Sequence, residues 1–166
     1  MTTFPQTTRD RVEVLHLLSR YPSTSYHEQK ISAVIESFLT ERGLKPERDA
    51  YGNLLAHYRQ NTKTAPVVLL AHMDHPGFHI IDWTGTEGTA QALGGVAKGC
   101  FTNGTPLRLI TEEGEAIPGE SMGASGEDGQ QLLRLRAKEP LKHAYPAFAV
   151  PEVTDFIVEE DRIRMR

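Results

Sequence analysis

Two residues of this sequence have the types and the spacing of a metal or acid–base site. His72 and Asp74 stand two positions apart, directly after an unbroken apolar run from Val67 to Ala71. In extended backbone, residues at this spacing point to the same side. The Asp74 carboxylate could share a metal ion with the His72 imidazole, or accept its second ring N–H and fix the tautomer. An isolated pair of this kind can equally be a hydrogen-bonded pair at a strand end.

The apolar run predicts the element that positions this pair. Pro66 precedes five apolar residues that begin with two valines, and polar residues follow them. This pattern is typical of a short strand buried on both faces of a parallel or mixed sheet. Ligands bind outside the carboxyl ends of strands in open α/β sheets. We therefore expect His72 at the tip of an interior strand, facing a cleft.

The residues before this strand predict two helices. Thr7 or Thr8 can cap a first helix, whose apolar residues fall on one face. Ser25 and Glu28 have the spacing of a capping box at the start of a second helix. Gly43 follows the apolar periodicity of that helix and predicts its end.

A hairpin is predicted between the second helix and the buried strand. The stretch from Asp49 to Asn53 has hairpin-turn chemistry, and we interpret Asp49 as a turn residue that bonds its own backbone. His57, in the second arm of this hairpin, is predicted to face solvent, and His27 is interpreted as a surface residue.

From Gly77 onward the composition predicts a different architecture. Most of the 14 glycines lie in this part of the chain, where short strand candidates follow one another with turn residues between them. Strands at such spacing, without an intervening helix signal, are typical of a small barrel or sandwich. Cys100 lacks any motif that would activate its thiol, so we interpret it as structural or incidental.

These patterns together predict an α/β fold with an inserted, small, all-β barrel-like domain. Residues 1–86 would form the amino-terminal part of the α/β domain, from two helices, a hairpin and the buried strand. Residues 87–153 would form the inserted domain, and residues 154–166 a strand that returns toward the first domain.

Composition excludes several classes of partner. The net charge is −4, with 18 Lys and Arg against 22 Asp and Glu, so binding to nucleic acid or to an anionic membrane has no electrostatic support. No apolar run reaches membrane-spanning length, and residues 1–5 lack the features of a signal peptide. A single cysteine fits a reducing compartment. We expect a cytoplasmic protein.

Motifs along nearly the whole chain resemble the M42 family of metallo-aminopeptidases, within the wider group of co-catalytic zinc peptidases. The motifs are Pro22 to Glu28, Asp49 to Leu54, Ala71 to Phe78, Leu93 to Gly95 and Gly104 to Leu107, the last two resembling the inserted β-domain of that family. One departure is visible. His75 follows the H-x-D motif directly, where family members usually carry a glutamate.

The resemblance implies a partial three-layer zinc-peptidase domain and a hydrolase that removes amino-terminal residues from peptides. It implies that His72 is a metal ligand and that Asp74 is the catalytic-site residue that orients it. It also implies two divalent ions, zinc most often, with cobalt or manganese possible, and a β-domain that mediates assembly into homo-oligomers. In that family the bridging aspartate, the general-base glutamate and the remaining ligands come later in the chain.

The number of candidate metal ligands in this sequence also indicates an incomplete site. A catalytic zinc needs about three protein ligands plus water. The other six histidines are scattered and no second H-x-D or H-E-x-x-H exists; they are His16, His27, His57, His75, His79 and His143. We expect the chain to be the amino-terminal portion of a metallopeptidase, truncated before most of the metal site and inactive alone.

Two other functions stay open at this point. The chain could be a non-catalytic module whose β-domain binds a partner or mediates assembly. It could also belong to an amidohydrolase or deacylase of the same zinc-peptidase group, acting on small N-acyl or amide substrates. Metal analysis separates the binding module from the two enzymes, and activity on aminoacyl substrates separates the two enzymes from each other.

Overall fold

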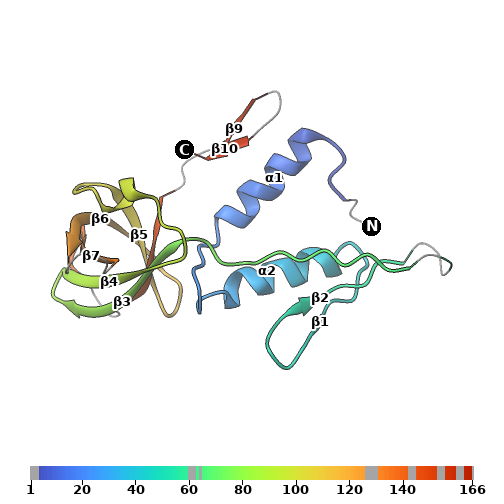
Figure 1. Cartoon of the computed structure of the whole chain (residues 1–166), viewed down its shortest axis with the longest axis horizontal. Helices are drawn as coiled ribbons and strands as arrows, with labels where there is room; N and C mark the ends of the chain where they lie inside the picture. The colour runs from blue at the N-terminus through green and yellow to red at the C-terminus, as the bar shows by residue number, and fades with distance from the viewer. Residues whose placement is uncertain are drawn as a thin grey trace. The chain divides into compact units, whose positions relative to one another are not determined.

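Alternating apolar residues in the second half of the chain close into a six-stranded barrel. The computed structural model describes residues 4–59, 63, 65–125, 131–141, 145–152, 156–159 and 163–165. Neighbouring strands of the barrel are antiparallel and follow the order β3-β4-β7-β6-β5-β8 (Figure 1). The strands are β3 (Gly77–Thr84), β4 (Glu87–Leu93), β5 (Pro106–Thr111), β6 (Ala116–Ser125), β7 (Leu132–Ala137) and β8 (Pro146–Pro151).

The barrel owes its core to strict alternation along its strands. In β7, Leu133, Leu135 and Ala137 are buried while the residues between them face solvent. They join Phe78, Leu107 and Leu109 in one cluster with almost no exposed surface. Phe101, in the 3-10 helix η1 (Lys98–Phe101), packs edge-on against Phe78. The predicted small barrel is confirmed, and it begins at Gly77, before the expected boundary at Glu87.

The chain divides into two compact units, each made of two stretches of sequence. The first unit comprises Met1–Tyr21 and Glu28–Met73, and the second comprises Pro22–His27 and Asp74–Arg166. The second unit therefore contains the barrel together with a short segment that precedes it by about 50 residues in the sequence. It also contains a hairpin of β9 (Phe156–Val158) and β10 (Ile163–Met165), where the sequence analysis predicted a single returning strand.

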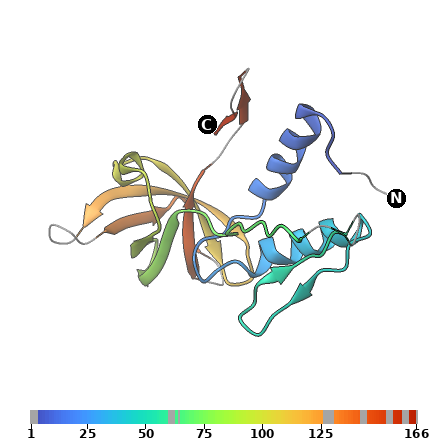
Figure 2. The same cartoon turned by 45° about the vertical axis from the view of Figure 1, so that its right-hand side comes forward.

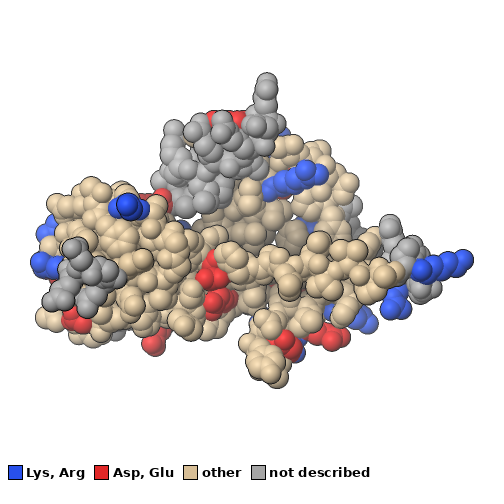
Figure 3. Space-filling view, in the orientation of Figure 1, with Lys and Arg blue, Asp and Glu red and all other residues tan. Residues whose placement is uncertain are grey.

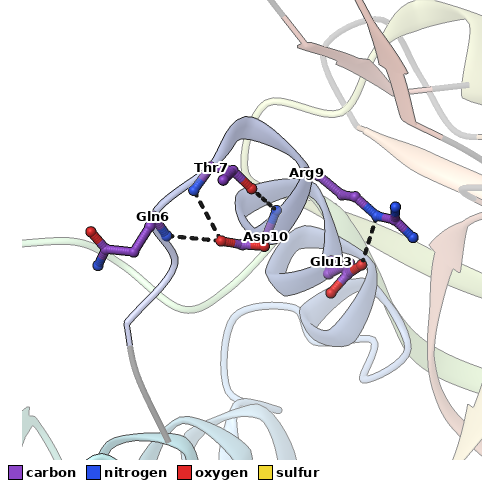
Figure 4. Close-up of polar contacts among 5 residues, drawn as sticks. All are labelled: Gln6, Thr7, Arg9, Asp10 and Glu13. Carbon is purple, nitrogen blue, oxygen red and sulfur yellow. Dashed lines mark hydrogen bonds and ion pairs between the residues drawn. The ribbon is translucent and has the colours of Figure 1, made fainter.

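The first helix of the first unit is capped as predicted. In α1 (Thr8–Ser19), the Asp10 N–H donates to the Thr7 hydroxyl at 3.2 Å, and the Thr7 N–H donates to the Asp10 carboxylate at 2.9 Å (Figure 4). This capping box satisfies two backbone donors that the helix leaves unpaired. The backbone N–H groups of Thr7 and Gln6 hold the pKa of Asp10 below its usual value.

The second helix begins without the capping box that the sequence predicted. In α2 (Gln29–Thr40), Glu28 is the N-cap residue and its side chain makes no capping bond. The expectation for Ser25 is wrong because its hydroxyl bonds to a residue far along the chain. The prediction that the helix ends at Gly43 is confirmed, because Gly43 adopts a positive φ of 82° in the turn that follows the helix.

The hairpin after α2 forms around its turn aspartate. Strands β1 (Glu47–Arg48) and β2 (Leu54–Leu55) pair antiparallel. Asp49 accepts bonds from the backbone N–H groups of Tyr51 and Asn53, each at 2.9 Å, and from the Asn53 amide at 2.8 Å. The turn interpretation of Asp49 is therefore confirmed. Arg48 ties the hairpin to α2 through Glu36 at 2.7 Å, and the two lie side by side in Figures 1 and 2.

The apolar run before His72 is not a buried strand. Val67, Val68, Leu69 and Leu70 are 84, 76, 91 and 94 % exposed, and residues 65–73 belong to no strand (Figures 1 and 2). The prediction of a buried strand is wrong for this structure. A run of this kind becomes a strand only against neighbouring strands, and none of the described residues pairs with it.

Candidate functional site

The two predicted site residues lie on either side of the point where the chain passes from the first unit to the second. His72 is exposed at the end of the first unit, whereas Asp74 is half-buried and begins the long stretch of the second unit. His75, which stands where the resembling family has a glutamate, is exposed. The expectation that His72 caps an interior strand therefore fails together with the strand.

The Asp74 carboxylate is held by a residue that the sequence did not single out as functional. The Ser25 hydroxyl donates to Asp74 Oδ2 at 2.7 Å, across 49 positions of sequence. This length is typical of a hydroxyl that donates to an oxygen acceptor. The only sequence signal for Ser25 was its place in the Pro22 to Glu28 motif, and its spacing from Glu28 suggested a cap instead.

The segment around Ser25 is fixed against the start of the barrel by backbone and side-chain contacts. The His75 N–H donates to the Ser23 carbonyl at 3.3 Å. Ser23 and Thr24 are fully buried, and a Cβ at Gly77 would lie only 2.8 Å from the Thr24 Cβ and Oγ1. Glycine at position 77 is therefore required by close approach, and it brings β3 directly under the segment.

A pair of histidines extends these contacts. His27 Nε2 lies 3.2 Å from His79 Nδ1, and the His27 ring stacks on Phe148 with the ring centroids 4.6 Å apart. His27 is half-buried, so it lies at the surface with part of its ring covered by these contacts. No sequence motif links these two histidines, because the contact depends on the segment folding onto β3 and β8.

The described residues do not assemble a complete metal site. Among them, no group of three or more His, Cys, Asp or Glu side chains is arranged to hold a metal ion. Cys100 offers no substitute nucleophile, since burial raises the pKa of its thiol and disfavours the reactive thiolate. What the residues provide is an exposed imidazole at His72 and, two positions on, the Asp74 carboxylate, which accepts a hydrogen bond from Ser25.

A cavity of 360 Å³ lies elsewhere, on the first unit between α1 and α2. Arg42 lines it beside three carboxylates, and its buried Nε finds no hydrogen-bond partner in the part of the chain that the structure describes. The guanidinium lies over the Phe38 ring, with Cζ 3.4 Å from the ring centroid, and its Nη1 donates to the Phe38 carbonyl at 2.9 Å. None of the predicted site residues lines this cavity.

Charge is dispersed over the surface. On the face drawn in Figure 3, basic and acidic side chains are scattered among neutral ones, and the described residues form no continuous basic patch there. The ion pairs are of the exposed kind, such as Arg134 with Glu87 at 3.0 Å and Arg48 with Glu36. Among the residues that the structure describes, no helix is long and apolar enough to cross a membrane.

Comparison with known proteins yields matches in structure alone. No protein-family model matches the chain, and no curated protein matches it in sequence. The solved dodecamer PhTET1-12s matches with a TM-score of 0.67 and 22 % identity, over 93 % of this chain and 48 % of its own. The aminopeptidase APDkam598 from the archaeon Desulfurococcus kamchatkensis matches with a TM-score of 0.67 and 16 % identity, over 90 % of this chain and 45 % of its own.

These matches establish the fold. The chain spans about half the length of each solved protein, so the likeness concerns one part of those molecules. Two helices with a hairpin and a closed antiparallel barrel are the elements that this chain brings to the comparison. The chain thus shares the fold of about half of each of these two solved proteins.

Proposed function

We propose that this chain is the amino-terminal portion of a metal-dependent aminopeptidase that removes amino-terminal residues from peptides. The observation that carries the proposal is the fold likeness to the archaeal aminopeptidase over 90 % of this chain. The H-x-D motif of His72 and Asp74 adds chemistry to that likeness, because it offers an imidazole and a carboxylate two positions apart in the sequence.

In this proposal His72 is one ligand of a divalent metal ion, zinc in the first instance. Asp74 accepts the second ring N–H of His72, which fixes the tautomer and raises the basicity of the ligand. His72 and Asp74 fall short of the three protein ligands that a catalytic zinc needs. We therefore assign no hydrolytic step to these 166 residues, and we propose that they are inactive alone.

The exposed run Val67 to Leu70 supports a site completed by residues outside this sequence. Four apolar side chains with more than three-quarters of their surface exposed are unfavourable in water, at about 25 cal/mol for each Å² of apolar surface. Pairing with strands from the remainder of a catalytic domain would bury them. The run would then become the interior strand of a three-layer domain, with His72 at its tip.

Assembly is part of the same proposal. PhTET1-12s is a dodecamer, and we propose that the complete protein is likewise a homo-oligomer that acts on peptides. A second candidate is a non-catalytic binding or assembly module. The closed barrel favours this second candidate, because it has its own buried core.

The test is hydrolysis of aminoacyl p-nitroanilides by protein from the complete reading frame that contains these residues, supplied with zinc or cobalt. We expect activity from that protein and none from residues 1–166 alone. His72→Ala should reduce hydrolysis to background and lower the bound metal per chain. His57→Ala is the matched control, since His57 is exposed and lies outside the proposed site.

The possible results separate the candidates. Activity that survives His72→Ala would rule out the role proposed for this residue. Bound metal with hydrolysis of N-acyl amino acids, but not of aminoacyl substrates, would indicate a deacylase. Failure to bind metal or hydrolyse either substrate would leave the binding module as the function.

A further inference from the structure

Two histidine rings join the segment Pro22–His27 to the barrel within the second unit. His27 Nε2 lies 3.2 Å from His79 Nδ1, and the ring centroids are 5.5 Å apart. The centroid distance is close to the nitrogen–nitrogen distance plus the two ring radii, so the two nitrogens point nearly straight at each other. One of these nitrogens must therefore carry a proton and donate it, while the other accepts.

This geometry suits a shared proton and does not suit a shared metal ion. Zinc binds a histidine nitrogen at about 2.0 Å, so an ion on the line between two nitrogens needs them about 4 Å apart. The observed separation of 3.2 Å is instead within the range of a hydrogen bond that an N–H group donates. The described residues also bring no third metal-binding side chain to the pair.

We propose that the His27–His79 pair is a pH-sensitive latch, which holds the segment Pro22–His27 on the barrel until both rings are protonated. The latch requires neither metal nor hydrolysis, so it stands apart from the proposed function. Its release would free the turn that carries Ser25, whose hydroxyl bonds the Asp74 carboxylate.

The contact survives the first added proton and is lost with the second. With one ring charged, the hydrogen bond becomes charge-assisted, and a charged His27 ring also gains a cation–π contact with Phe148, 4.6 Å away. With both rings charged, both facing nitrogens carry protons. Neither can then accept, and two like charges face each other. The neutral and singly charged pairs therefore hold the segment, and the doubly charged pair releases it.

The latch fastens the carboxyl end of a segment that is under backbone strain. At the amino end, the Ser23 carbonyl accepts from the His75 N–H at 3.3 Å. At the carboxyl end, the His27 N–H donates to the Thr24 carbonyl at 2.9 Å and closes a turn. Inside this turn Tyr26 has a φ of 74°, the only positive φ of a residue other than glycine among the described residues. A conformation of this kind persists only where its surroundings fix it, so loss of the histidine contact favours release.

Few other charged groups surround the pair. Strand β8, against which the His27 ring stacks, carries no titratable residue. The charged or titratable residues of the neighbouring elements are His75 and Asp82 in and before β3, Glu87 in β4, Arg108 in β5, Asp74 bonded to Ser25, and Glu28 directly after His27. Histidine is the side chain that ordinarily changes charge between pH 5 and 8. His75 is therefore the group that a test of the latch must control for.

The experiment measures backbone hydrogen exchange of the 166-residue chain between pH 8 and pH 5. The amides of His27 and His75 report on the segment, because they donate to the Thr24 and Ser23 carbonyls. The released pair binds two protons and the held pair one. The held state is therefore fully favoured above about pH 6.5 and loses about tenfold per pH unit as the pH falls below that value. We expect the protection factors of both amides, corrected for intrinsic exchange, to fall by this factor.

Three variants assign the effect. His79→Gln keeps a side chain that can donate and accept but cannot gain a proton, so protection of the segment should no longer fall in acid. His27→Gln makes the same test from the other ring. His75→Gln is the matched control, because His75 is exposed and contacts the segment through its backbone. The acid loss should persist in this control.

The contrary results are distinct. Segment amides that keep their protection down to pH 5 in the original chain would overturn the latch. An acid loss that persists in either glutamine variant of the pair, or that disappears in His75→Gln, would do the same. The Leu135 amide, in a strand paired on both sides, reports on the barrel and should stay protected throughout. Its loss together with the segment would mean that acid unfolds the whole barrel, and the latch would be refuted. Metal binding and hydrolysis are not measured, so failure of the latch leaves the proposed function to its own test.

Discussion

The barrel and the run before His72 use similar apolar residues with opposite results. Leu107, Leu109 and Leu133 are at most 1 % exposed in the barrel, whereas Leu69 and Leu70 are 91 and 94 % exposed in the first unit. The barrel strands find all their partners within the chain and close on themselves. An apolar run therefore becomes a buried strand only where strands that can pair with it exist, whatever its own composition.

The largest effect is expected when a large side chain is removed from the core of the barrel. Phe78→Ala should lower the free energy of unfolding by about 3–5 kcal/mol, because Phe78 is fully buried. Leu70→Ala should change it by less than about 0.5 kcal/mol, because its side chain already faces water. Urea unfolding followed by the fluorescence of the single tryptophan, Trp83 in β3, measures both. Equal costs would show that the run is buried in solution.

A smaller loss of stability is expected where the segment Pro22–His27 lies close to the start of β3 within the second unit. Gly77→Ala would place a methyl group 2.8 Å from Thr24 and 2.9 Å from the Ala149 carbonyl. The free energy of unfolding should fall by about 1–3 kcal/mol, as for other overpacked sites. Gly95→Ala is the control, since a Cβ there meets no atom within 4 Å. If the two variants unfold at the same urea concentration, the segment does not press on β3.

Two buried threonines of the second unit should respond in opposite directions. The Thr24 hydroxyl has no hydrogen-bond partner among the described residues, so Thr24→Val should raise the free energy of unfolding by about 1 kcal/mol. The Thr111 hydroxyl accepts from the Glu115 N–H at 3.1 Å, so Thr111→Val should lower it by about 1 kcal/mol. The same urea titration applies. A loss in both variants would mean that the Thr24 hydroxyl is bonded, for instance to water.

The smallest effect concerns the hairpin turn and its dependence on pH. The bond from the Asn53 amide, ahead of the backbone N–H bonds, holds the pKa of Asp49 below its usual 3.8. The carboxylate therefore stabilises the turn above pH 3.8, and this contribution is lost as the pH falls through the lowered value. Hydrogen-exchange protection of the Tyr51 and Asn53 amides should drop in acid.

Asp49→Asn tests this assignment, because asparagine keeps the turn geometry but does not ionise. Its protection factors should lose their acid dependence, whereas Glu47→Gln, in the exposed strand beside the turn, should retain it. An acid transition that persists in Asp49→Asn would assign the effect to another group.

The parts of the fold that could be predicted are those decided by local rules. The Thr7 cap and the Asp49 turn depend on residues within a few positions of each other, and the barrel depends on alternation within each strand. The two predictions that failed, the Ser25 cap and the buried strand at Val67, depend on contacts with residues far away in the sequence. Ser25 has the spacing of a cap, yet a carboxylate 49 positions away takes its hydroxyl. The run at Val67 has the composition of a strand but no partner among the described residues.

The candidate site shows the same limit. His72 and Asp74 could be singled out because their spacing is visible in the sequence. Their neighbours could not, because Ser25 and His27 reach Asp74 and His79 only when the segment folds onto the barrel. No periodicity or short motif encodes such a contact, so its discovery required the tertiary structure.

The two units are interleaved along the polypeptide, which passes between them after Tyr21, after His27 and after Met73. A gene fragment that starts at Asp74 would encode every barrel strand and still omit the piece that covers Gly77. The barrel is therefore poorly suited to transplantation as a contiguous cassette, and recombination that exchanged it whole would have to carry the distant hexapeptide Pro22–His27 as well.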